Sequence, residues 1–126
     1  MKRMIVKLDS TKARIFDWFN RTKIPEVVQK DQPLHLENLN KDALTPHKRK
    51  YFNRLAKLIS AADEVYILGN KITNSEFKHH IEKKFGQHLI KKIVGIETIM
   101  SHSSDNDVFN QGTAFFKHYK TFTPNY

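Results

Sequence analysis

The stretch EVYILGNKITNSEFKHHI, residues 64–81, places a strand and a helix in direct succession. Residues 64–68 form a short apolar run that Gly69 ends, which is typical of a buried strand. The spacing from Thr73 to Glu76 matches a capping box, and apolar residues then recur every four positions. The stretch therefore predicts a strand over 64–68 and a helix that begins at Thr73 and ends at Gly86.

Elements of the same two kinds flank this stretch along the chain. Before it, Thr45 and Pro46 supply an N-cap and a first helical residue for a helix with an apolar stripe. After it, residues 92–97 predict a strand. Residues 103–107 predict a turn and cap, and the face from Val108 to Tyr119 predicts a last amphipathic helix.

The first thirty residues predict strands only. Residues 4–9 and 13–19 are short apolar or alternating runs around a turn at 10–12, so they predict a β-hairpin. A third strand over 24–29 would begin beside Pro25, which favours an edge position. Alternating strands and helices after a hairpin predict a single three-layer α/β domain over residues 1–126, with a mixed sheet. Residues 30–45 are polar without a period, and we expect a long loop there, of a length that is often functional or mobile in compact domains.

Composition excludes several classes of protein. Cysteine is absent, so disulfide scaffolds, cysteine nucleophiles and thiolate zinc sites are excluded. No apolar run approaches the roughly 18 residues of a membrane span, and the first seven residues lack the apolar core of a secretory signal. We expect a cytoplasmic protein without cofactors, and the sequence leaves its oligomeric state open.

The positive charge is concentrated in two segments. The chain has 22 Lys and Arg residues against 13 Asp and Glu, a net charge of +9. Residues 41–60 hold six basic residues and one acidic, residues 71–92 hold six and two, and the rest of the chain is balanced. Such segments attract polyanions, although basic helix faces also serve solubility alone. The candidate nucleic-acid-binding residues are Lys48, Lys50, Arg54, Lys57, Lys78, Lys83, Lys84, Lys91 and Lys92.

Motifs for catalysis or metal binding are absent from the sequence. It has no phosphate-binding loop, dinucleotide fingerprint or nucleophile elbow. His79 and His80 diverge by about 100° on a helix, so we predict no metal site there. The carboxylates of Asp9, Asp17 and Glu97 lie on or beside predicted strands, and nothing in the strand pattern brings them together. We therefore predict no catalytic residues.

Most of the aromatic residues occur at core spacing. Trp18, Phe19 and Tyr126 do not follow that spacing and could stack on bases.

Three stretches in order resemble the small bacterial proteins of the translational machinery family, which look related to the middle domain of archaeo-eukaryotic peptide-chain release factors. The stretches are residues 6–16, residues 65–70 with 75–81, and residues 92–98 leading to Phe115 and Phe116. The resemblance implies a ribonuclease H-like fold of the translational machinery component type. In release factors the loop before the first long helix carries Gly-Gly-Gln, which positions a water at the peptidyl-tRNA ester. Residues 31–45 contain no glycine, so the resemblance does not carry over that activity.

Three functions remain open on these grounds. The leading hypothesis is a non-catalytic RNA- or ribosome-associated protein of the translation-factor class. The alternatives are a hydrolase, either of peptidyl-tRNA or a divalent-metal nuclease that uses Asp9, Asp17 or Glu97, and a protein-interaction module that pairs through an edge strand. The sequence leaves open whether the two basic segments share one face.

Overall fold

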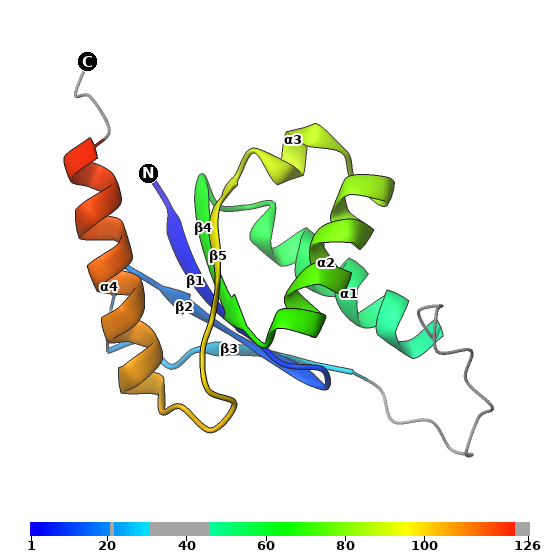
Figure 1. Ribbon diagram of the computed structural model, residues 1–126, viewed down its shortest axis with the longest axis horizontal. Helices are drawn as coiled ribbons and strands as arrows, with labels where there is room; N and C mark the ends of the chain where they lie inside the picture. Colours follow the sequence, from blue (N-terminus) through cyan, green and yellow to red (C-terminus); the bar gives the residue numbers. More distant parts are fainter. Residues whose placement is uncertain (21, 31–45, 123–126) are drawn as a thin grey trace.

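The computed structural model describes residues 1–20, 22–30 and 46–122 as a five-stranded mixed sheet with helices on both faces (Figure 1). The sheet order is β3-β2-β1-β4-β5, in which β1–β2 and β2–β3 are antiparallel and β1–β4 and β4–β5 are parallel. This confirms the predicted α/β class with a mixed sheet. In chain order the elements are β1 (Arg3–Leu8), β2 (Lys12–Asp17), β3 (Glu26–Gln29), α1 (Pro46–Ile59), β4 (Glu64–Gly69), α2 (Lys71–Lys84), α3 (Gln87–Ile90), β5 (Ile93–Thr98) and α4 (Asp105–Phe122).

The helices form two layers of unequal size. Figure 1 shows α1, α2 and α3 on one face of the sheet and α4 on the other. Strand alternation supplies a separate core to each layer. Met4, Val6 and Leu8 of β1 pack in the cluster that contains α1 and α2, whereas Ile5 packs with Phe116 of α4. The two central strands, β1 and β4, are therefore covered on both faces.

The hairpin prediction is confirmed. The β1–β2 register runs from Met4 opposite Asp17 to Leu8 opposite Ala13, and the Asp9 amide donates to the Lys12 carbonyl at 2.9 Å. The third strand begins directly after Pro25 and lies at the edge of the sheet, as the proline predicts.

The prediction that α2 begins at Thr73 is wrong, because Asn70 caps the helix. Asn70 has extended backbone angles, and its Oδ1 accepts a hydrogen bond from the Thr73 amide at 2.8 Å. Strand β4 ends at Gly69, so the first cap residue after the strand starts the helix. At the other end, Gly86 has a φ of 75° and its amide bonds to the Ile81 carbonyl at 2.9 Å, which confirms the predicted stop. The short helix α3 that follows was not predicted.

A capping box opens α4 within the predicted turn at 103–107. The Asp107 amide donates to Ser104 Oγ at 3.1 Å, and the Ser104 amide donates to Asp107 Oδ2 at 3.2 Å. Val108, Phe109 and Phe116 then pack in the core of this layer, on the face that the spacing predicted. None of the helices that the structure describes is both long and apolar enough to cross a membrane.

Candidate nucleic-acid interface

The described parts of both basic segments, residues 46–60 and 71–92, belong to the same helical layer. Helices α1 and α2 pack side by side on one face of the sheet, through Phe52 and Phe77 and through a hydrogen bond between Asn53 Oδ1 and His80 Nε2 at 2.7 Å. Residues 46–92, which contain this layer, hold eleven basic and four acidic residues. Residues 93–126, which contain α4, hold two basic and three acidic. The charge is therefore segregated by layer as well as by sequence.

Helix α1 presents its cations because the opposite stripe is buried. Tyr51, Phe52, Leu55, Ala56 and Ile59 lie in the core, which leaves Lys50, Arg54 and Lys57 exposed. The guanidinium of Arg54 donates to the Gln29 carbonyl of β3. Arg54 and Lys57 also line an open groove with Val27, Val28, Gln29 and Leu58. These two cations therefore lie at the β3 margin of the layer.

The cations of α2 and of the residues that follow it lie farther from β3, toward β5. Lys78, Lys83, Lys84 and Lys91 are exposed. Lys78 lines a groove with Ile93, Gly95 and other residues beside β5, at the opposite edge of the sheet. The nine candidate residues are thus on one layer but not in one groove.

Three of the nine candidate cations, namely Lys48, Arg54 and Lys92, have hydrogen-bond or ion-pair partners within the described chain. Lys48 Nζ lies 2.6 Å from Glu76 Oε1, and this ion pair joins α1 to α2. Lys92 Nζ donates to the Ser60 carbonyl at 2.6 Å. The Glu76 carboxylate partly neutralises the positive charge of the Lys48 ammonium group. Lys48 is therefore a weaker candidate for nucleic-acid contact than its exposed neighbours.

The sequence did not identify His80 as the residue at the seam between α1 and α2 beside which cations of both helices lie. His80 is almost fully buried, and burial lowers its pKa. The positive charges of Lys84, Arg49 and His79 lower that pKa further, which brings cations of both helices to one place. Arg49 was not among the predicted residues. No signal in the sequence alone places Arg49 near His80, because their proximity depends on how α1 packs against α2.

The three carboxylates of the hydrolase hypothesis do not form one group among the described residues. Asp9 follows β1 and pairs with Lys7, with 2.7 Å between Oδ1 and Nζ. Asp17 pairs in register with Met4, near the other end of β1, about 16 Å away at roughly 3.3 Å per residue. Glu97 accepts a hydrogen bond from the Tyr66 hydroxyl, whose pKa is raised mainly by burial and also by that bond. Among the described residues, no three His, Cys, Asp or Glu side chains are grouped to hold a metal ion.

The aromatic candidates have different environments. Trp18 packs against Phe116 and donates from Nε1 to Thr113 Oγ1 at 3.3 Å, so it anchors α4. The guanidinium of Arg3 lies over the Trp18 ring, 5.4 Å from its centroid. Phe19 is 58% exposed. Tyr126 and residues 31–45 of the loop predicted over 30–45 lie outside the described residues.

Comparison with known proteins gives a likeness of fold. No protein-family profile matches the sequence, and no curated protein matches it. Among solved structures, the chain is similar to Pelota from Archaeoglobus fulgidus, with a TM-score of 0.54 and 7% sequence identity. The likeness covers 95% of this chain and 37% of that one, so the chain spans little more than a third of the protein it resembles. At this identity the likeness concerns the fold alone. The five-stranded α/β fold of this chain is therefore similar to the fold of one part of Pelota.

Proposed function

We propose that this chain is a non-catalytic RNA- or ribosome-associated protein of the translation-factor class. The observation that carries the proposal is the segregation of charge between the two helical layers. Eleven basic residues accompany four acidic ones in residues 46–92, whereas the α4 segment has no excess of positive charge. A protein that uses cations only for solubility has no need to place them on one side of its sheet.

The proposed contact residues are the nine predicted cations together with Arg49. The ammonium groups of Lys50, Lys57, Lys78, Lys83, Lys84 and Lys91 are exposed and make most of the contacts. Long-range attraction and counterion release give such a surface its affinity for a polyanion.

The sequence resemblance gives the proposal its translation context, and the fold is compatible with it. The chain is similar in fold to a part of Pelota that makes up 37% of that protein. The sequence resembles the middle domain of the peptide-chain release factors and lacks their Gly-Gly-Gln motif between residues 31 and 45. Membership of the bacterial translational machinery family, a single-domain organisation and a cytoplasmic location are parts of the same proposal.

Sedimentation with purified bacterial ribosomes tests the proposal. The protein is expected in the ribosome pellet at about 50 mM salt and largely in the supernatant at about 200 mM, because phosphate contacts weaken steeply with salt. Recovery of the wild-type protein in the supernatant at about 50 mM salt, together with no binding to purified ribosomal RNA or to the RNA probes below, would show that the proposal is wrong.

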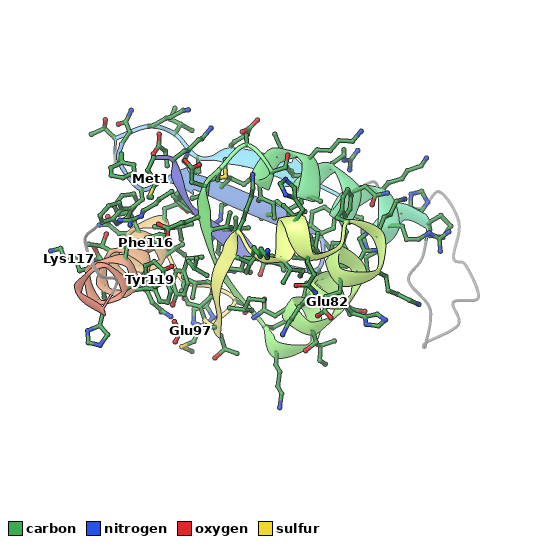
Figure 2. All side chains as sticks on the ribbon, turned by 90° about the horizontal axis from the view of Figure 1, so that it is seen from above. Met1, Glu82, Glu97, Phe116, Lys117 and Tyr119 are labelled. Atoms are coloured by element: carbon green, nitrogen blue, oxygen red, sulfur yellow. The ribbon has the colours of Figure 1, made fainter. Side chains whose placement is uncertain are left out.

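Two matched double variants assign the contact to a layer. Lys50→Glu with Lys84→Glu reverses two exposed charges on the α1–α3 layer. Lys23→Glu with Lys117→Glu reverses two exposed charges on the β2–β3 connection and on α4 (Figure 2 labels Lys117). The Lys50→Glu, Lys84→Glu variant is expected in the supernatant. The Lys23→Glu, Lys117→Glu variant is expected in the ribosome pellet. Equal behaviour of the two variants would show that net charge, not this layer, is responsible.

A further inference from the structure

The α1–α3 layer also indicates which form of RNA it fits. We infer that this surface binds the phosphate backbone of double-stranded RNA and does not read the bases of a single strand. The inference rests on the proposed function, and it names the substrate class of the same surface.

The layer offers no aromatic platform on which bases could stack. Residues 46–92 contain five Phe and Tyr residues and no Trp. Tyr51, Phe52, Tyr66 and Phe77 are buried, and Phe85 packs against the core. Proteins that bind single strands place successive bases on exposed aromatic rings, which contribute roughly 1–3 kcal/mol per base. Without such rings, the affinity of this surface comes from its charges alone.

The exposed aromatic ring of the described chain lies elsewhere. Of the Phe, Tyr and Trp side chains that the structure describes, Phe19 is the one that is mostly exposed. It follows β2, and its ring meets that of Trp18 at 4.9 Å between centroids. Trp18 is bound to Thr113 of α4, so Phe19 lies toward the α4 layer. A base stacked on Phe19 would not share a surface with the cations of α1 and α2.

The cations are spread across the layer rather than along one channel. Arg54 and Lys57 lie beside β3, whereas Lys78 lies beside β5. These strands are the two edges of a five-stranded sheet, about 19 Å apart at roughly 4.8 Å per strand. Arg49 and Lys84 lie between these margins, near His80. A rigid duplex presents phosphates of two strands over a surface of this width, and duplex RNA is recognised through its backbone and shape.

Two exposed imidazoles are the remaining rings that could stack. His79 belongs to α2 and His88 to α3, and both are exposed. Histidine can stack on bases, so a test of the inference must separate this contribution from that of charge. Measurements at pH 8 keep most histidines neutral, because their ordinary pKa is about 6.5.

Binding of one RNA sequence in two forms tests the inference. The probes are a blunt RNA duplex of about 20 base pairs, long enough for backbone contacts over more than one groove, and its two separated strands. At pH 8 and about 50 mM salt, the protein is expected to bind the duplex about tenfold more tightly, a difference of about 1.4 kcal/mol. Phe19→Ala and the double variant His79→Ala with His88→Ala are expected to leave duplex affinity unchanged. Lys50→Glu is expected to weaken binding and to reduce the slope of log affinity against log salt by about 1.

Three outcomes would overturn the inference. Equal or tighter binding of the single strands would do so, as would a loss of affinity in Phe19→Ala or in the histidine double variant. If the protein sediments with ribosomes and prefers single strands, the proposed function stands and only the inference is wrong. If it binds neither ribosomes nor either RNA form, both are wrong.

Discussion

Gly112 of α4 lies so close to Ile5 of β1 that a Cβ atom on Gly112 would come 2.2 Å from Ile5 Cδ1 and 2.6 Å from Cγ1. Ile5 is fully buried on this face of the sheet, in the cluster that Val108 and Phe116 complete. The helix therefore approaches the strand at a point where no side chain fits. This contact sets how closely the single helix of its layer covers the sheet.

Gly112→Ala is expected to destabilise the protein despite a better helix propensity. Alanine gains about 1 kcal/mol over glycine within a helix, but overpacking a buried contact costs about 1–3 kcal/mol. We expect a net loss of about 1 kcal/mol in the free energy of unfolding, measured with urea. Ile5→Val removes the Cδ1 methyl group and should recover part of that loss in the double variant. Strict additivity of the two single changes would contradict the account.

The ion pair of Lys7 and Asp9 gives a second test of the buried structure. Lys7 is fully buried, and its Nζ lies 2.7 Å from Asp9 Oδ1 and 2.9 Å from the Ser101 carbonyl. Asp9→Asn leaves a buried ammonium group without its counter-charge, so we expect a loss of about 2–3 kcal/mol in unfolding free energy. Lys7→Met with Asp9→Asn removes both charges, and it should be more stable than Asp9→Asn alone. Urea titration of both variants checks which of them has the higher free energy of unfolding. For an isolated surface pair the two variants would not differ in this way, because such pairs contribute little to stability.

His80 makes the stability of the protein depend on pH. Its pKa in the folded protein is lowered from the ordinary value of 6.5, mainly by burial and further by Lys84, Arg49 and His79. The unfolded chain therefore binds this proton more readily, and unfolding is favoured as the pH falls through and below 6.5. The free energy of unfolding should be lower at pH 5.5 than at pH 7.5. His80→Gln can keep a hydrogen bond to Asn53 and should show a smaller decline. An unchanged decline would assign the pH dependence to other groups.

The ion pair of Lys48 and Glu76 controls how much charge the basic layer offers. Glu76→Gln removes the carboxylate that holds the Lys48 ammonium group at 2.6 Å. If the layer binds RNA as proposed, this change should raise the affinity several-fold and steepen the salt slope by about 1. Glu82→Gln is the matched control, because it removes an exposed acid of the same helix that takes part in none of the ion pairs found between described residues. Glu82→Gln should raise the RNA affinity less than Glu76→Gln does and should leave the slope of log affinity against log salt unchanged. Equal slopes in the two variants would show that the Lys48–Glu76 pair does not control the charge available to RNA.

The strands, the three longer helices and their order could be predicted because each has a strong local signal, whereas the four-residue helix α3 was not predicted. The apolar run of β1 and the cap of α4 depend on neighbours in the sequence, and both are present in the structure. The pairing of Lys48 with Glu76 could not be predicted, because it joins residues 28 positions apart on two helices. Which cations of the candidate interface stay exposed depends on how those helices pack, which also explains why Arg49 was missed.

The start of α2 also could not be predicted from its local sequence. Asn70 and Thr73 are both good cap residues, and Glu76 follows Thr73 at capping-box spacing. In the structure Asn70 Oδ1 accepts the Thr73 amide, while Glu76 pairs with Lys48 of α1 instead of reaching back to Thr73. The tertiary ion pair competes with the local motif, and the end of β4 at Gly69 selects the earlier cap.

Asn70→Ala therefore tests which residue begins the helix. Loss of its side-chain acceptor leaves the Thr73 amide without a partner at the start of α2, so we expect a loss of about 1 kcal/mol in unfolding free energy. Asn70→Asp restores an acceptor at the same place and should retain most of the stability, since a negative charge also suits a helix N-terminus. Urea denaturation of both variants supplies the measurement. If Thr73 were the cap instead, Asn70→Ala and Asn70→Asp would be equally close to the wild-type protein, because neither change would touch the hydrogen bond that starts the helix.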